Sequence, residues 1–197
     1  MYEGFVNAAK EVFGKKTKVV VDRFHVSKLY RASFEELRKS ELNRLKKTLS
    51  KEDNKKLKNV IWILRKNPSD LKQNDLKVLK FLFKHSPLLE IGYTLRNELT
   101  DIFNEQIEKN VAKKKIDFWI KKIQKSELKC FNKFISTLEK MREEILNYFI
   151  CRYNSGFVEG LNNKIKVLKR RCYGLTNLSN LFKRLHLDLT GYRNYLL

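Results

Sequence analysis

The chain of 197 residues is 42% hydrophobic and carries 43 Lys and Arg against 22 Asp and Glu, for a formal net charge of +21. This composition suffices for a hydrophobic core and excludes wholesale disorder. The surplus of positive charge favours a polyanionic partner, with nucleic acid first and an anionic membrane surface second. A Lys-rich composition with a merely solvated surface is the alternative.

The order of apolar residues predicts a mostly helical chain with one strand. A first helix is predicted from Tyr2 to Phe13, ended by Gly14. The consecutive valines of Lys18–Asp22 are typical of a buried strand in a parallel sheet, yet no other segment offers the partner that its backbone groups need. Further helices are predicted at about 26–49, 57–64, 76–83, 88–109, 116–123, 128–149, 157–172 and 178–195.

The apolar faces of these helices have the width of an ordinary packed bundle. A membrane-surface protein would need a broader exposed apolar face, so we expect no membrane partner. We expect the aromatic side chains to lie in the core rather than to stack on bases. They are Trp62, Phe81, Phe83, Phe103, Trp119 and Phe131.

The segment from Tyr153 to Tyr192 carries the clearest chemical pattern. Asn154, Ser155 and Gly156 form a turn and a helix N-cap, and the helix that follows has an apolar stripe at spacings of 3 and 4. Its other face begins with a carboxylate, continues with two amides and ends with cations. These residues are Glu159, Asn162, Asn163, Lys166, Lys169 and Arg170. A carboxylate is a hard ligand for Mg²⁺ or Mn²⁺, and the cations suit phosphates. The alternative is an exposed basic helix with an incidental glutamate.

A second polar pattern follows the predicted strand. Asp22 ends the strand and His25 lies three residues later. In isolation the pair is either a metal or phosphate contact, or a capping aspartate beside a packed histidine.

Together these segments resemble the DDE transposases of bacterial insertion sequences, in the ISL-three branch. The resemblance covers essentially the whole chain and is carried by three stretches, of which the last is the most specific. They are DRFHV at 22–26, WILRKNPSDL at 62–71 and FVEGLNNKIKVLKRRCYG at 157–174.

The resemblance implies an RNase H-like catalytic domain, in which two aspartates and one glutamate hold two Mg²⁺ or Mn²⁺ ions for strand cleavage and transfer. Glu159 matches the glutamate. Asp22 and His25 match an accessory D-x-x-H element, although Asp22 is alternatively the second acid. The family's second aspartate would lie just before Met1, so the chain is expected to be an N-terminally truncated copy that binds no metal and lacks autonomous activity.

We therefore expect a mostly α fold. Residues 1–30 would be the remnant of the RNase H-like core, with one strand and flanking helices. Residues 31–149 would be a helical insertion, and residues 150–197 the glutamate helix and a C-terminal helix. Leu181, Phe182, Leu185, Leu187 and Leu189 would pack this last helix. Glu159 is expected to lie close to Asp22 or His25.

DNA is the expected partner, and contact with the chain itself or with a full-length transposase is a second expectation. Cytoplasm at the nucleoid is the expected location, since the sequence has no apolar run of about 18 residues and its three cysteines are scattered. A non-catalytic helical DNA-binding or regulatory protein is the alternative. The residues expected to contact DNA are Asn162, Asn163, Lys164, Lys166, Lys169, Arg170, Arg171, Lys183 and Arg184.

Overall fold

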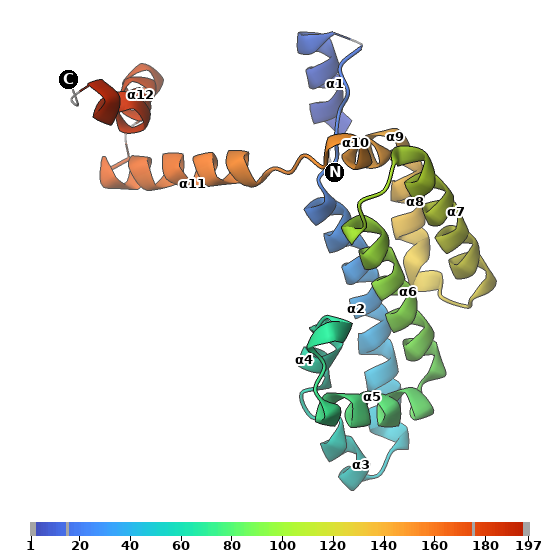
Figure 1. Ribbon diagram of the computed structural model, residues 1–197. Helices are drawn as coiled ribbons and strands as arrows, with labels where there is room; N and C mark the ends of the chain where they lie inside the picture. Colours follow the sequence, from blue (N-terminus) through green and yellow to red (C-terminus); the bar gives the residue numbers. More distant parts are fainter. Residues whose placement is uncertain (1–2, 15, 175, 195–197) are drawn as a thin grey trace. The chain divides into compact units, whose positions relative to one another are not determined.

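Helices make up the regular structure of the described residues, 3–14, 16–174 and 176–194, in this computed structural model (Figure 1). The chain divides into two units, Met1–Tyr153 and Asn154–Leu197, each with its own internal contacts. The mostly α fold predicted from the sequence is thus confirmed. No helix of the described ranges is both long enough and apolar enough to cross a membrane.

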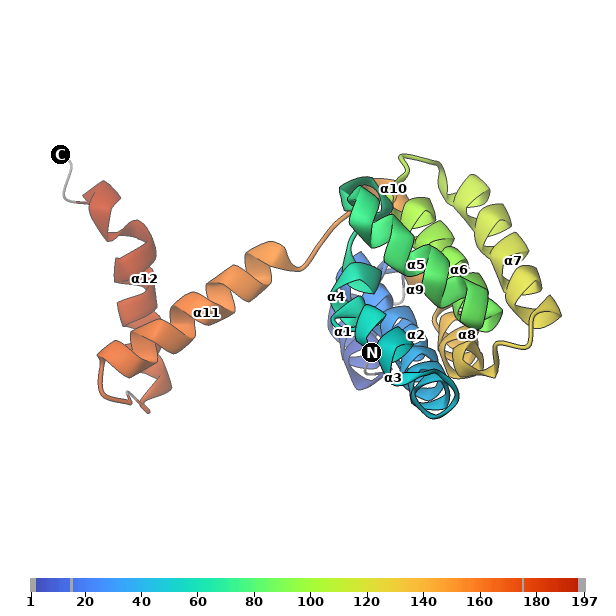
Figure 2. The ribbon, with the colours of Figure 1, turned by 90° about the horizontal axis from the view of Figure 1, so that it is seen from below.

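The first unit contains ten α-helices and two short 3-10 helices within its described residues. They are α1 (Glu3–Phe13), α2 (Arg23–Thr48), α3 (Lys51–Lys56), α4 (Val60–Arg65), η1 (Pro68–Asp70), α5 (Gln73–His85), α6 (Pro87–Asn104), α7 (Lys109–Lys125), η2 (Lys129–Phe131), α8 (Asn132–Lys140), α9 (Arg142–Leu146) and α10 (Tyr148–Cys151). Helix α6 packs against both α2 and α7, and α8 packs on α2 (Figure 2).

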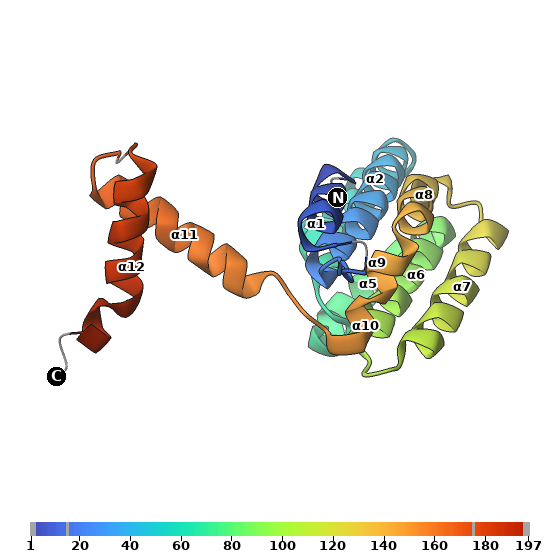
Figure 3. The same ribbon diagram turned by 90° about the horizontal axis from the view of Figure 1, so that it is seen from above.

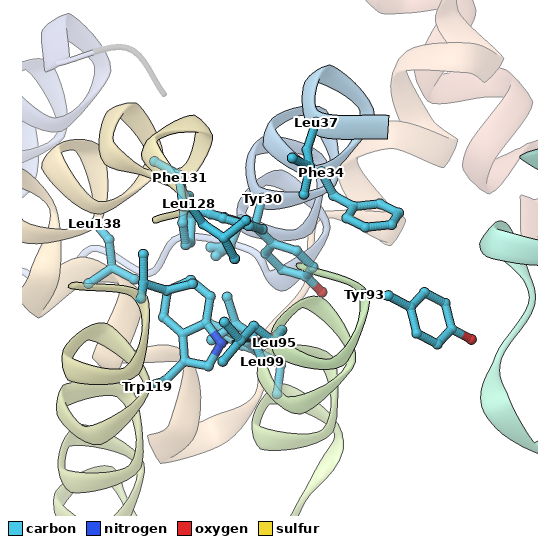
Figure 4. Close-up of a cluster of buried hydrophobic side chains, with 14 of the residues drawn as sticks. Tyr30, Phe34, Leu37, Tyr93, Leu95, Leu99, Trp119, Leu128, Phe131 and Leu138 are labelled. Carbon is cyan, nitrogen blue, oxygen red and sulfur yellow. Dashed lines mark hydrogen bonds between the residues drawn. The ribbon is translucent and has the colours of Figure 1, made fainter. Parts of the chain in front are cut away.

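The core of the first unit lies where α2, α6, α7 and α8 meet (Figure 4). Trp119 of α7 is 1% exposed, and its indole Nε1 donates a hydrogen bond of 2.7 Å to the carbonyl of Leu95. The rings of Phe131 and Phe134 stand edge-on to this indole, at 5.8 and 5.9 Å. A buried indole with its N–H satisfied and aromatic edges around it contributes a large share of a core's stability.

A buried polar network joins the middle of α2 to the start of α6. The hydroxyl of Ser86 donates to Glu41 at 2.6 Å and accepts from the N–H of Leu89 at 3.3 Å, so it also caps α6. Arg44 donates to Glu41 at 2.7 Å and to the carbonyl of His85 at 3.0 Å. The hydrogen bond from Arg44 is the main reason that the pKa of Glu41 is lowered. The network satisfies a carboxylate that would otherwise be costly to bury.

This network should make the first unit sensitive to acid. Because the folded state lowers the pKa of Glu41, its stabilisation is complete above the pKa of the unfolded chain, roughly 4.3, and is lost as pH falls through the folded value. We expect Glu41→Gln to lower the free energy of unfolding by about 1–3 kcal/mol at pH 7 and by much less at pH 3. Urea unfolding at both pH values measures this. Glu52→Gln, at an exposed position, is the control, and an equal effect of Glu41→Gln at both pH values would contradict the assignment.

The strand predicted over Lys18–Asp22 is wrong. The segment has no regular secondary structure, and no strand occurs in the described ranges. Two of its backbone groups bond to the region around α9 instead. The N–H of Val21 donates to the carbonyl of Glu144 at 2.9 Å, and the side chain of Asn147 donates to the carbonyl of Val19 at 2.9 Å. A run of valines indicates that the segment is buried, and Val21 is indeed buried, but the run does not identify the partner.

The single long helix predicted over 128–149 is also wrong. The chain forms η2, α8, α9 and α10 there, with turns at Met141 and Asn147 (Figure 3). The break at Asn147 has a tertiary cause, because the carbonyl of Glu144 accepts the N–H of Val21 instead of continuing the helix. The side chain of Asn147 also donates a hydrogen bond to this segment, at the carbonyl of Val19.

Most of the aromatic side chains predicted for the core are buried or packed against it, but Trp62 is not. Trp62 is 61% exposed, and the guanidinium of Arg65 lies over its ring at 5.3 Å. A six-residue helix gives α4 only two buried positions, Val60 and Leu64, which are four apart. Trp62 lies between them in sequence and so faces away from the core.

The second unit consists of α11 (Gly156–Arg171) and α12 (Leu178–Asn194). Leu168 and Leu181 are buried where the two helices meet. The packing predicted for Phe182, Leu187 and Leu189 is wrong, because these side chains are 49–66% exposed; α12 has only α11 as a neighbour within its unit, and one neighbour covers one face. Tyr2 and Tyr195, the outer ends of the first and last predicted helices, lie outside the described residues.

Candidate functional site

The start of α11 fixes the position of Glu159. The side chain of Asn154 accepts the N–H of Gly156 at 3.0 Å, which forms the turn before the helix. The N–H of Glu159 donates to the carbonyl of Ser155 at 2.8 Å, and the hydroxyl of Ser155 donates to Glu159 Oε1 at 2.7 Å. The carboxylate is therefore exposed in the first helical turn, where the helix dipole favours negative charge.

The polar face predicted for α11 is present and open to solvent. Its amides and cations, namely Asn162, Asn163, Lys166, Lys169 and Arg170, are all exposed. Arg170 donates weakly to the carbonyl of Lys166 at 3.4 Å, and the described residues contain no ion pair to any of the three cations. These cations therefore present positive charge along one face, beginning about two turns beyond the carboxylate.

Three other predicted cations lie around a carboxylate of α12. Lys164 forms an ion pair of 2.9 Å with Asp188, which joins α11 to α12. The hydrogen bond from Lys164 is the main cause of the lowered pKa of Asp188, and the charges of Arg171 and Arg184 lower it further. Lys164 is therefore already paired with a carboxylate of its own unit. Lys183 is exposed and has no ion pair in the described part of the chain.

The D-x-x-H element begins helix α2. One oxygen of Asp22 accepts the N–H of Phe24 at 2.8 Å, which caps the helix. His25 is exposed, and its ring meets that of Phe24 edge-on at 5.7 Å. Asp22 is therefore a helix-capping residue, as one alternative expected. The packed histidine of that same alternative is not found, because His25 is exposed. Glu159 belongs to the second unit and Asp22 to the first, so the expected closeness of these residues stays a prediction.

Glu159 can supply one ligand to a divalent cation, but the residues around it do not complete a metal site. The second unit has only two carboxylate side chains, Glu159 and Asp188, and the latter is held by Lys164. No group of three or more His, Cys, Asp or Glu side chains gathers in the ranges that the structure describes. A two-metal centre at Glu159 would thus need carboxylates from other segments.

Comparison with known proteins places these features in context. A family model described as a transposase, with a DDE domain of the ISL-three type, matches residues 1–185. The transposase of insertion sequence IS1001 from Bordetella parapertussis is 29% identical over 180 residues, which cover 89% of this chain and 43% of that protein. The transposase of IS1557 from Mycobacterium tuberculosis is 27% identical over 139 residues, which cover 71% and 31%. The chain spans less than half the length of these relatives, and no solved structure matches it significantly.

Proposed function

Because the chain belongs to the ISL-three family of transposases, we propose that it acts in DNA transposition by binding DNA along α11 and supplying Glu159 to a metal centre. Residues 31–149 would be the family's helical insertion, and residues 1–30 would belong to its RNase H-like domain. The protein would act on DNA at the nucleoid, in the cytoplasm. Contact with another transposase copy is part of the same proposal.

The polar face of α11 carries this proposal. Lys166, Lys169 and Arg170 are exposed and free of carboxylate partners in the described residues, so a DNA phosphate would meet no internal competitor. Phosphate contacts of this kind position a strand without reading its sequence. Glu159 lies at the beginning of the same face, so a strand held by the cations would pass the metal ligand.

Bound Mg²⁺ or Mn²⁺ would activate a water or 3′-hydroxyl and stabilise the leaving oxygen. The residues of this chain have a narrower role. Ser155 holds one oxygen of Glu159, which fixes the side-chain rotamer and leaves the other oxygen available as a ligand. The cations of α11 hold the strand. Autonomous cleavage by these 197 residues is not part of the proposal, because one carboxylate cannot hold two metal ions.

A non-catalytic DNA-binding regulator is the second candidate. The same cations on α11 favour it, since they need no metal to bind DNA. The two candidates differ in whether Glu159 contributes to strand cleavage.

We expect the triple substitution Lys166→Ala, Lys169→Ala, Arg170→Ala to weaken duplex DNA binding about 100-fold near physiological salt. Each lost phosphate contact removes roughly 0.9 from the log–log slope of affinity against salt, so the slope should become less steep by about 2.7. Fluorescence anisotropy with a labelled duplex at several salt concentrations measures both quantities.

The control removes three exposed cations from α5 and α7, through Lys77→Ala, Lys114→Ala and Lys121→Ala. Both variants lose the same net charge, so an effect of overall charge alone would weaken binding equally. Equal weakening, or no change in the α11 variant, would remove α11 from the DNA interface.

A further inference from the structure

A cleft in the first unit carries an inference independent of α11. It has a volume of about 810 Å³ and is walled by α2, by the α4–η1 segment and by α6. Six cations line it, namely Arg23, Lys28, Arg31, Arg65, Lys66 and Arg96. Its volume lies in the range typical of clefts that enclose a ligand.

The positive charge of this cleft is only partly offset by the protein. Two carboxylates also line it: Glu35, which is held by Arg38 at 2.8 Å and by Arg65 at 3.4 Å, and Asp101, which forms no ion pair in the described residues. Lys66 is already paired with Asp75 at 2.7 Å. The three cations of α2, Arg23, Lys28 and Arg31, have no ion pair within the described ranges. Lys28 and Arg31 are three positions apart and so share one face of the helix, and Arg23 lines the cleft from its first turn.

Arg96 in the cleft wall is the most buried of these cations, and its guanidinium lies over the rings of Phe34 and Tyr93 at 5.1 and 4.8 Å. It is only 8% exposed, and its guanidinium donates to the carbonyl of Leu64 at 2.6 Å and to Asn97, both neutral groups. No carboxylate lies within ion-pair distance of it in the described residues. Burial lowers the pKa of Arg96 and the positive charge of Arg31 lowers it further, whereas Tyr93 and Glu35 oppose this shift. A buried cation beside a second cation is costly, and a bound anion would relieve that cost.

An exposed aromatic ring adjoins the cationic cleft. Trp62 precedes the cleft residue Arg65 by three positions on α4, is 61% exposed and lies under the Arg65 guanidinium at 5.3 Å. Cations that track phosphates beside an aromatic platform for bases are the combination used to bind single-stranded nucleic acid. A duplex is convex and carries its phosphates outside, so it cannot bring one to a side chain that is 8% exposed, whereas a single strand can bend into a cleft.

We propose that this cleft, lined by Lys28, Arg31 and Arg96 and adjoined by Trp62, binds a single strand of DNA. The phosphates would lie against the cations, and a base would stack on Trp62. The site rests on the proposed function only in that DNA is the anion; it uses none of the residues of α11. It would hold a displaced strand while α11 holds duplex.

The two tryptophans of the chain make the test direct, since Trp62 is exposed and Trp119 is 1% exposed. Oligothymidylate of twelve nucleotides, titrated into the full chain, is expected to quench the fluorescence of Trp62. Trp62→Phe should abolish the quenching. Lys28→Ala with Arg31→Ala should weaken the apparent affinity about tenfold and flatten the log–log salt slope by about 1.4, at roughly 0.7 per phosphate of a single strand.

Lys114→Ala with Lys121→Ala is the control of equal charge from α7, and it should leave the quenching unchanged. Lys28→Arg with Arg31→Lys keeps both charges and should retain affinity, which separates loss of charge from loss of fold. Unchanged quenching in the alanine variant, or equal quenching by a polyglutamate of the same charge or by a blunt duplex, would overturn the proposal. Failure of the α11 variant to lose duplex binding would contradict the proposed function alone, because the Trp62 signal reports only on the cleft.

Discussion

Glu159→Gln is expected to lower strand cleavage about 10³-fold or more in a form of the protein extended upstream of Met1. The amide keeps the size of the side chain and its contact with Ser155 but removes the charge that a divalent cation requires. Loss of a metal ligand forfeits several kcal/mol of transition-state stabilisation, and each 1.36 kcal/mol is a factor of ten in rate. Nicking of a labelled terminal-repeat duplex in Mn²⁺ measures the effect.

The 197-residue chain alone is expected to give no cleavage in the same assay, because Glu159 cannot by itself hold two ions about 4 Å apart. Glu127→Gln, at an exposed position of the first unit, is the matched control and should cleave normally in the extended form. Cleavage by the short chain, or full activity of the extended Glu159→Gln protein, would contradict the role of Glu159. The second result would favour the non-catalytic regulator.

Trp119→Ala should lower the free energy of unfolding of the first unit by about 3–5 kcal/mol. The indole lies at the centre of the core, so its removal leaves a cavity between α6, α7 and α8 that the surrounding helices can close only in part. The hydrogen bond to the carbonyl of Leu95 is lost as well. Urea unfolding followed by far-UV circular dichroism measures the change.

Trp62→Ala provides the comparison within the same chain. Its ring is 61% exposed and keeps one cation contact with Arg65, so we expect a loss below about 1 kcal/mol. Losses of similar size at the two positions would show that the core is not centred on Trp119.

Helical periodicity was sufficient to predict the elements whose burial follows their own sequence. The stripe of Ile116, Trp119 and Ile123 in α7 is buried throughout, because one continuous helix packs one face on the core. The break near Asn147 could not be predicted in this way. It depends on Val21 and its partner Glu144, and a pattern read along one segment contains no information on a contact with a distant one.

The same distinction applies to the candidate sites. The face of α11 is a local feature, so the spacing of Glu159, Lys166 and Arg170 was enough to predict it. The cleft is assembled from three segments, at 23–35, 65–69 and 96–104, that no periodicity brings together. Trp62 was the one residue of this surface that the sequence analysis considered. It was assigned to the core, because an aromatic residue near apolar neighbours is ordinarily buried, yet it is exposed.

The bonds of Val19 and Val21 to the turn around α9 also bear on how the first unit opens. Val19 and Asn147 are 128 positions apart in sequence, yet their hydrogen bond forms only while both segments are in place. The amide N–H of Val21 belongs to no helix, but its hydrogen bond to the carbonyl of Glu144 protects it from exchange with solvent. Detachment of the Val19–Val21 segment and loosening of α9 are therefore one cooperative event. The rate at which the Val21 amide exchanges with solvent reports on both.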